Sequence, residues 1–169
     1  MPPADGLVKL DAMENPWPWP AELREAWLEV VQAAALNRYP DPTAGALQAT
    51  LREAMSVPAS AQVVLGNGSD ELIQMIVQTV AASGRVIMAP EPTFVMYRQI
   101  AAVCGLEFSG VPLNADFSLD RGQLLAAVEA WQPAVIFLAY PNNPTGNLFD
   151  ANIIRELLGV ADGLVVVDE

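Results

Sequence analysis

Short apolar runs alternate with helix-length segments from residue 57 onward, and this alternation is the feature that most constrains the fold. The runs that predict strands are 62–65, 85–89, 107–112, 134–140 and 164–167, and the segments between them that predict helices are 69–82, 93–104, 120–131 and 150–160. Strands that are apolar almost without interruption are typical of a parallel sheet buried on both faces. The pattern therefore predicts an α/β fold, with a mostly parallel sheet and helices on both of its faces.

Residues 1–56 lack this alternation. The alternating prolines within 15–20 exclude a helix interior, because proline has no N–H donor and forces the residue before it into extended geometry. Apolar residues at helical spacing predict one helix over 21–36, and a second helix is expected over 44–55. We therefore expect an N-terminal arm and a helix to precede the α/β portion.

The composition argues against several classes of function. Lys and Arg total 8 against 20 Asp and Glu, a net charge of −12. No basic cluster is present to neutralise a nucleic-acid backbone, and an anionic bilayer would repel this chain. The absence of histidine removes the Ser-His-Asp triad and His-ligated metal sites. With a single cysteine, no secretory signal and no long apolar run, we expect a cytoplasmic protein without nucleic-acid, membrane or metal partners.

Ligands of parallel α/β sheets bind beyond the carboxyl ends of the strands, and three segments fall there: 66–70, 140–146 and 168–169. The first is a turn of small residues that opens a helix. Its free backbone N–H groups and positive dipole end favour an anion, most often phosphate. An ordinary turn capped by Ser69 or Asp70 is the alternative, and the glycine spacing matches neither the dinucleotide-binding nor the P-loop pattern.

Five further side chains are candidates for ligand contacts, each with a structural alternative. Asn143 lies before a proline, so its amide is held where it could bind a ligand oxygen, or it belongs to an ordinary turn. Asp168, at the tip of a strand, could balance a cationic group such as a protonated ring nitrogen, or cap a following helix. Phe94 could stack on a flat ring or pack in the core. Trp17 and its neighbour Trp19 could pack or line a substrate pocket.

Six short motifs occur in one order, and together they make the chain resemble the first half of a fold-type I, pyridoxal-phosphate-dependent aminotransferase of class I/II. The motifs are Glu-Asn-Pro at 14–16, Arg-Tyr-Pro-Asp at 38–41, Gly-Asn-Gly-Ser-Asp-Glu at 66–71, Pro-Thr-Phe-Val-Met-Tyr at 92–97, Pro-Asn-Asn-Pro-Thr-Gly at 141–146 and Val-Asp-Glu at 167–169. The pattern is most similar to the histidinol-phosphate aminotransferases. This resemblance implies transamination of histidinol phosphate with 2-oxoglutarate, an amino donor and a 2-oxo acid.

The resemblance also implies a domain division and a phosphate site. Residues 1–40 would form the N-terminal arm and part of the small domain, and 41–169 the N-terminal portion of the cofactor-binding large domain. Gly68, Ser69 and Asp70 would cup the phosphate of pyridoxal 5'-phosphate at a helix N-terminus. Tyr39 would reach the cofactor phosphate of the neighbouring subunit, which implies a homodimer.

Three more roles concern the cofactor ring. Phe94 matches the aromatic residue that stacks on the pyridine ring, and Asn143 matches the Asn that hydrogen-bonds the ring's phenolic oxygen. Asp168 matches the carboxylate that pairs with the pyridinium nitrogen and so keeps the ring an electron sink.

The N-terminal arm would lie near the substrate, where Asn15, Trp17 and Trp19 are the substrate-binding candidates. The Schiff-base Lys of the family is absent, because Lys9 is the only lysine and lies in the wrong place. We therefore expect a fragment that is not competent alone and that contains no catalytic residue of its own.

Several alternatives remain open at this stage. Within the same fold, an aromatic amino-acid aminotransferase or a threonine-phosphate decarboxylase would share these motifs. A non-catalytic module that binds phosphate or pyridoxal phosphate would keep the anion site without the chemistry. A nucleotide-binding α/β domain is the third alternative.

Overall fold

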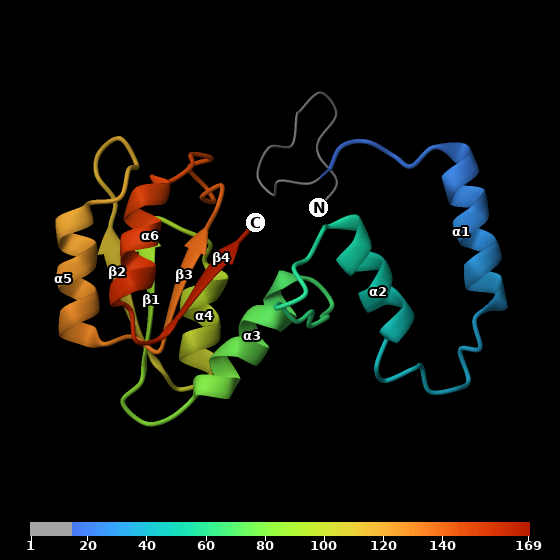
Figure 1. The fold of residues 1–169 in the computed structure, drawn as a ribbon, viewed down its shortest axis with the longest axis horizontal. Helices are drawn as coiled ribbons and strands as arrows, with labels where there is room; N and C mark the ends of the chain where they lie inside the picture. The colour runs from blue at the N-terminus through green and yellow to red at the C-terminus, as the bar shows by residue number, and fades with distance from the viewer. Residues whose placement is uncertain (1–14) are drawn as a thin grey trace, which may run out of the picture. The chain divides into compact units, whose positions relative to one another are not determined.

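The computed structural model describes residues 15–169, and this part of the chain divides after residue 58 into two compact units, a first over 15–58 and a second over 59–169 (Figure 1). The first unit contains helices α1 (Ala21–Ala33) and α2 (Gly45–Ala54). The second unit contains, in chain order, α3 (Ser69–Val80), β1 (Val86–Glu91), α4 (Met96–Val103), β2 (Glu107–Pro112), α5 (Arg121–Trp131), β3 (Val135–Ala139), α6 (Ala151–Val160) and β4 (Leu164–Asp168). None of the helices in this described part is long and apolar enough to cross a membrane. Lys9 and Glu14 lie outside the described residues.

The four strands form one sheet in the order β2-β1-β3-β4, and every pairing is parallel. Each strand reaches the next through a helix, as parallel strands require. The carboxyl ends of all four strands therefore lie at one edge of the sheet, which we call the carboxyl edge. The parallel sheet predicted from the sequence is confirmed.

Helices cover both faces of the sheet, and β3 shows how. Val135 and Phe137 pack with residues of α3 and α4, whereas Ile136 and Leu138 pack with residues of α5 and α6. All of these β3 side chains are buried, because successive residues of a strand point to opposite faces and both faces are covered. This burial on both faces explains why the sequence of β3 is apolar at every position.

The strand predicted over 62–65 is wrong. These residues precede α3 without strand structure, and no strand within residues 15–169 pairs with them. Val64 is 65% exposed. A β-branched run becomes a strand only where another strand supplies the hydrogen bonds, and the sequence pattern does not contain that information.

The first unit buries much less. Neither α1 nor α2 contains a buried residue. The Trp19 and Trp27 rings meet edge to face, with centroids 6.1 Å apart. Before α2, the Asp41 carboxylate accepts hydrogen bonds from the Thr43 backbone N–H and hydroxyl, at 2.9 and 2.7 Å. The boundary between the compact units follows residue 58, whereas the division at residue 40 concerns the domains of the family and stays a prediction.

Candidate functional site

The loops that follow β1 and β3 meet at the carboxyl edge of the second unit. A buried side chain, Asn142, joins them and is only 1% exposed. Its Nδ2 donates to the Pro92 carbonyl at 3.0 Å and to Thr145 Oγ1 at 2.6 Å, and its Oδ1 accepts from the Thr93 hydroxyl at 3.1 Å. A buried amide is stable only when its polar atoms are paired, and here they are. Asn142 therefore fixes the two loops against each other.

This connection positions two of the predicted residues, Phe94 and Asn143. Phe94 follows Pro92 and Thr93, and Asn143 follows Asn142 directly. The Phe94 ring is half-buried, where it packs against the core and meets Tyr97 edge to face at 5.6 Å. The Asn143 side chain is also half-buried, and within the described chain its amide makes no hydrogen bond. Its donors and acceptor are therefore available to a ligand.

The half-buried carboxylate of Asp168 ends β4 at the same edge. Its Oδ2 accepts a hydrogen bond of 2.7 Å from the Tyr97 hydroxyl. Its backbone carbonyl accepts from the Tyr140 N–H at 2.8 Å, which ties the end of β4 to the loop after β3. Burial, and then the hydrogen bond to Asp168, raise the pKa of the Tyr97 phenol far above its ordinary value. Tyr97 is therefore the hydrogen-bond donor, and Asp168 is the acceptor.

The predicted anion site is the turn before α3. Gly68 is the N-cap residue, with φ of +83°, a left-handed conformation that favours glycine. Apart from Gly68 and its two chain neighbours, no residue has an atom within 4 Å of the place where a Cβ would stand. Ser69 and Asp70 are exposed and open the helix, so their backbone N–H groups have no partner inside it. The alternative of a Ser69 or Asp70 cap is wrong, because no side chain caps this helix.

The side chain of Glu71 already takes one backbone donor of this turn. Glu71 Oε2 accepts a hydrogen bond from the Asn67 backbone N–H at 2.5 Å. The remaining open donors of the turn are thus those of the helix start itself.

The candidate residues of the first unit are exposed. Asn15 Oδ1 accepts from the Trp17 backbone N–H at 3.0 Å, and Tyr39 is fully exposed. Trp19 contacts Trp27 of α1. The roles predicted for Asn15, Trp17, Trp19 and Tyr39 stay predictions.

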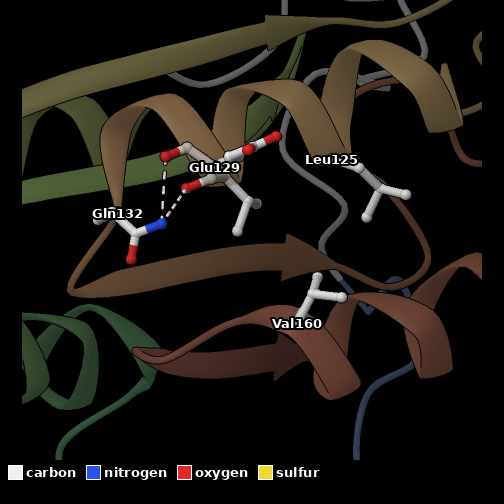
Figure 2. A pocket seen from close by; sticks show the side chains of 5 residues that line it. Leu125, Glu129, Gln132 and Val160 are labelled. Atoms are coloured by element: carbon white, nitrogen blue, oxygen red, sulfur yellow. Dashed lines mark hydrogen bonds between the residues drawn. The ribbon is translucent and has the colours of Figure 1, made fainter.

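A pocket of about 280 Å³ lies between α5 and α6 (Figure 2). Leu125, Val128, Glu129, Gln132 and Val160 line it. Gln132 Nε2 donates to the carbonyls of Glu129 and Val128, at 3.1 and 3.4 Å, and so closes the end of α5. Both helices end here just before the next strand begins, so the pocket lies at the edge opposite the candidate site. Within residues 15–169, no group of three or more acidic or Cys side chains could hold a metal ion.

Sequence reasoning missed two residues that organise the carboxyl edge, Tyr97 and Asn142. Both lie inside motifs that it used. Tyr97 lies on the face of α4 that also carries the buried Ile100 and Ala101. Asn142 precedes Asn143 in a turn whose composition gave no sign that one amide would be buried.

Comparison with known proteins identifies the family. The family model described as "Aminotransferase class I and II" matches residues 5–169. The chain belongs to this family.

The chain is similar to several curated relatives. The protein named histidinol-phosphate aminotransferase 2 in Nitrosococcus oceani is 55% identical over 98% of this chain and 46% of the relative. Histidinol-phosphate aminotransferase 1 of Ralstonia nicotianae is 57% identical over the whole chain and 46% of the relative. The histidinol-phosphate aminotransferase of Thiocapsa roseopersicina is 53% identical over 99% of this chain and 89% of that protein. The chain thus spans about half the length of two of these relatives and most of the third.

Solved structures share the fold of this chain. The histidinol-phosphate aminotransferase of Sinorhizobium meliloti, solved in complex with pyridoxal-5'-phosphate, matches 90% of the chain with a TM-score of 0.76 and 25% identity; the match covers 40% of that protein. The histidinol-phosphate aminotransferase of Clostridium acetobutylicum matches 96% of the chain and 47% of its own with a TM-score of 0.82. At 20% identity, the second match shows the fold alone.

Proposed function

We propose that the carboxyl edge of the second unit binds pyridoxal 5'-phosphate, and that the protein acts in the transamination of histidinol phosphate with 2-oxoglutarate. The observation that carries this proposal is the Asp168 carboxylate. It lies half-buried at the end of β4, with Oδ2 held by Tyr97 and Oδ1 without a hydrogen bond inside the described residues. The names of the relatives support the choice of substrates.

The donor set at this edge fits the cofactor. A phosphate needs N–H groups that no side chain occupies, and the start of α3 offers them beside the open space at Gly68. A flat ring needs an aromatic neighbour, which is Phe94, and its oxygen needs a donor, which is the free amide of Asn143. A ring nitrogen that carries a proton needs a carboxylate, which is Asp168. When bound, pyridoxal phosphate supplies an electron sink for reactions at the substrate Cα.

Each residue then has one task. Ser69 and Asp70, after Gly68, donate backbone N–H groups to the phosphate. Phe94 and Asn143 hold the ring in place and fix its rotation. Asp168 holds the proton on the ring nitrogen. None of these tasks requires the residue to give up or take a proton during turnover.

The first unit contributes the remaining contacts in this proposal. Tyr39, which is fully exposed, reaches the cofactor phosphate of a neighbouring subunit in a cytoplasmic homodimer. Asn15, Trp17 and Trp19 bind the substrate.

Residues 15–169 contain no lysine, so none of them can supply the lysine that transamination requires. The residues at the carboxyl edge therefore bind and orient the cofactor, and proton transfer at the substrate needs a lysine from elsewhere. This arrangement also suits a module that binds pyridoxal phosphate without catalysis.

Two measurements test the proposal. The protein at the length that its gene encodes is assayed for amino transfer to 2-oxoglutarate from histidinol phosphate, phenylalanine and tyrosine, and for decarboxylation of threonine phosphate. We expect the highest kcat/KM for histidinol phosphate, and no turnover of it would contradict the substrate assignment. Separately, pyridoxal phosphate, ATP and NAD are titrated into the same protein. Tighter binding of a nucleotide than of pyridoxal phosphate would overturn the cofactor assignment.

A further inference from the structure

The fully buried side chain of Tyr97 carries a single polar group, its hydroxyl. The ring stacks on Phe137 of β3, with centroids 4.7 Å apart and planes inclined by 7°. Phe94 packs against it edge to face at 5.6 Å. Because aromatic neighbours and the close-packed core hold the ring, the position of the hydroxyl is fixed as well.

The fixed hydroxyl holds one oxygen of Asp168 and leaves the other open. It donates to Oδ2 at 2.7 Å, between residues 71 positions apart in the chain. A carboxylate accepts hydrogen bonds at both oxygens, and in the described residues Oδ1 accepts none. The carboxylate plane is therefore set from the protein side, while one oxygen stays available at the carboxyl edge.

The Tyr97 hydroxyl is the donor in this hydrogen bond. Burial raises the pKa of the Tyr97 phenol, and the hydrogen bond and charge of Asp168 raise it further. Tyr97 therefore keeps its proton and donates, and Asp168 accepts.

We propose that Tyr97 is a positioning residue for Asp168, and that its hydroxyl turns the carboxylate so that Oδ1 meets the ring nitrogen of the bound cofactor. This inference rests on the proposed function. The alternative is that the same hydrogen bond only ties α4 to β4. The two differ in one respect, because only a positioning role alters the proton on the cofactor ring when the hydroxyl is removed.

The test uses Tyr97→Phe in the protein at its full encoded length, with pyridoxal phosphate labelled with ¹⁵N in the ring. The substitution removes the hydroxyl and keeps the stacked ring. We expect the dissociation constant for pyridoxal phosphate to rise about tenfold, and the ¹⁵N resonance to show a ring nitrogen that loses its proton at lower pH than in the unsubstituted protein. Ile100→Val is the control, because it removes one buried methyl group from the same helix and keeps both the aromatic stack and the hydroxyl of Tyr97. It should destabilise the fold slightly without moving the ¹⁵N titration.

Two outcomes separate failure of this inference from failure of the proposed function. If the unsubstituted protein does not bind pyridoxal phosphate, both are overturned. If it binds with a protonated ring and Tyr97→Phe titrates identically, only the positioning role is overturned. Should Tyr97→Phe not fold, 3-fluorotyrosine at position 97 keeps the ring and strengthens the donor. An unchanged ¹⁵N resonance in that protein would also contradict the positioning role.

Discussion

The two units of this chain differ in how they hold their side chains. In the second unit, a parallel sheet is buried on both faces, and candidate residues such as Asp168 are held by hydrogen bonds to buried partners. In the first unit, α1 and α2 bury no residue, and the candidates Trp17 and Tyr39 are exposed. The side chain of a site residue has a fixed position before its ligand binds only where a packed core fixes the neighbouring residues.

The largest expected effect comes from the core of the second unit. Phe137→Ala removes a fully buried ring in the central strand β3, and we expect a loss of about 4 kcal/mol in the free energy of unfolding. Trp27→Ala in α1 is the matched change in the first unit. Trp27 is 48% exposed, so its loss should be below about 1.5 kcal/mol. Hydrogen exchange in urea, resolved by peptide, measures both, and equal losses would break the comparison.

A smaller effect is expected at the buried amide of the carboxyl edge. Asn142→Ala leaves the Pro92 carbonyl and the Thr93 hydroxyl without their partner, which should cost about 2 kcal/mol. The exposed Asn114, which donates to the Ser118 hydroxyl at 2.9 Å, provides the control. Asn114→Ala should change the free energy of unfolding by less than about 0.5 kcal/mol. Urea denaturation followed by circular dichroism measures both variants, and a loss at Asn142 no larger than at Asn114 would show that the two loops are not joined through it.

The smallest effect is expected at exposed carboxylates that accept a local hydrogen bond, Asp120 in the second unit and Asp41 in the first. Asp120 accepts from the Gln123 backbone N–H at the start of α5, and this hydrogen bond lowers the pKa of its carboxyl below 3.8. A depressed folded-state pKa contributes stability above the unfolded value, and this contribution is lost as the pH falls through the folded value. Asp120→Asn keeps a hydrogen-bond acceptor but does not titrate. Its loss of stability relative to the unsubstituted protein should therefore shrink as the pH falls from about 7 to about 2.

Asp41 in the first unit should behave in the same way, because Thr43 lowers the pKa of its carboxyl without any burial. Asp41→Asn is therefore expected to show the same direction of pH dependence. Thermal denaturation across the pH range measures both variants. If the loss of stability of either variant grew as the pH falls, the lowered pKa of that carboxyl would be contradicted.

The sequence predicted most of the fold because burial determines it. The run 135–139 is apolar at every position, and it forms the central strand with every residue buried. Residues 63–65 are apolar as well and form no strand, since pairing depends on a partner far away in the chain. The start of one helix also differs from the prediction. The helix predicted from residue 93 begins at Met96, because Pro92 and Thr93 belong to the loop that hydrogen-bonds to Asn142.

The candidate site was predictable to a lesser extent. Asp168 and Asn143 were found because polar residues after apolar strands reach the carboxyl edge by topology. Tyr97 was missed because a tyrosine on the apolar face of a helix resembles any core aromatic until the position of its hydroxyl is known. The partner of Asp168 is 71 residues away, so no local pattern indicates it.

The most direct test of the carboxyl edge as a cofactor site is the affinity of Asp168→Ala for pyridoxal phosphate, in the protein at its full encoded length. Loss of a partly buried carboxylate that pairs with a ring nitrogen should weaken binding roughly tenfold to hundredfold and abolish transamination. The control is Asp162→Ala, which removes an exposed carboxylate before β4, at the opposite edge of the sheet. We expect normal affinity for Asp162→Ala and an intact fold for both variants by circular dichroism. Equal affinities in Asp168→Ala and in the unsubstituted protein would contradict the site.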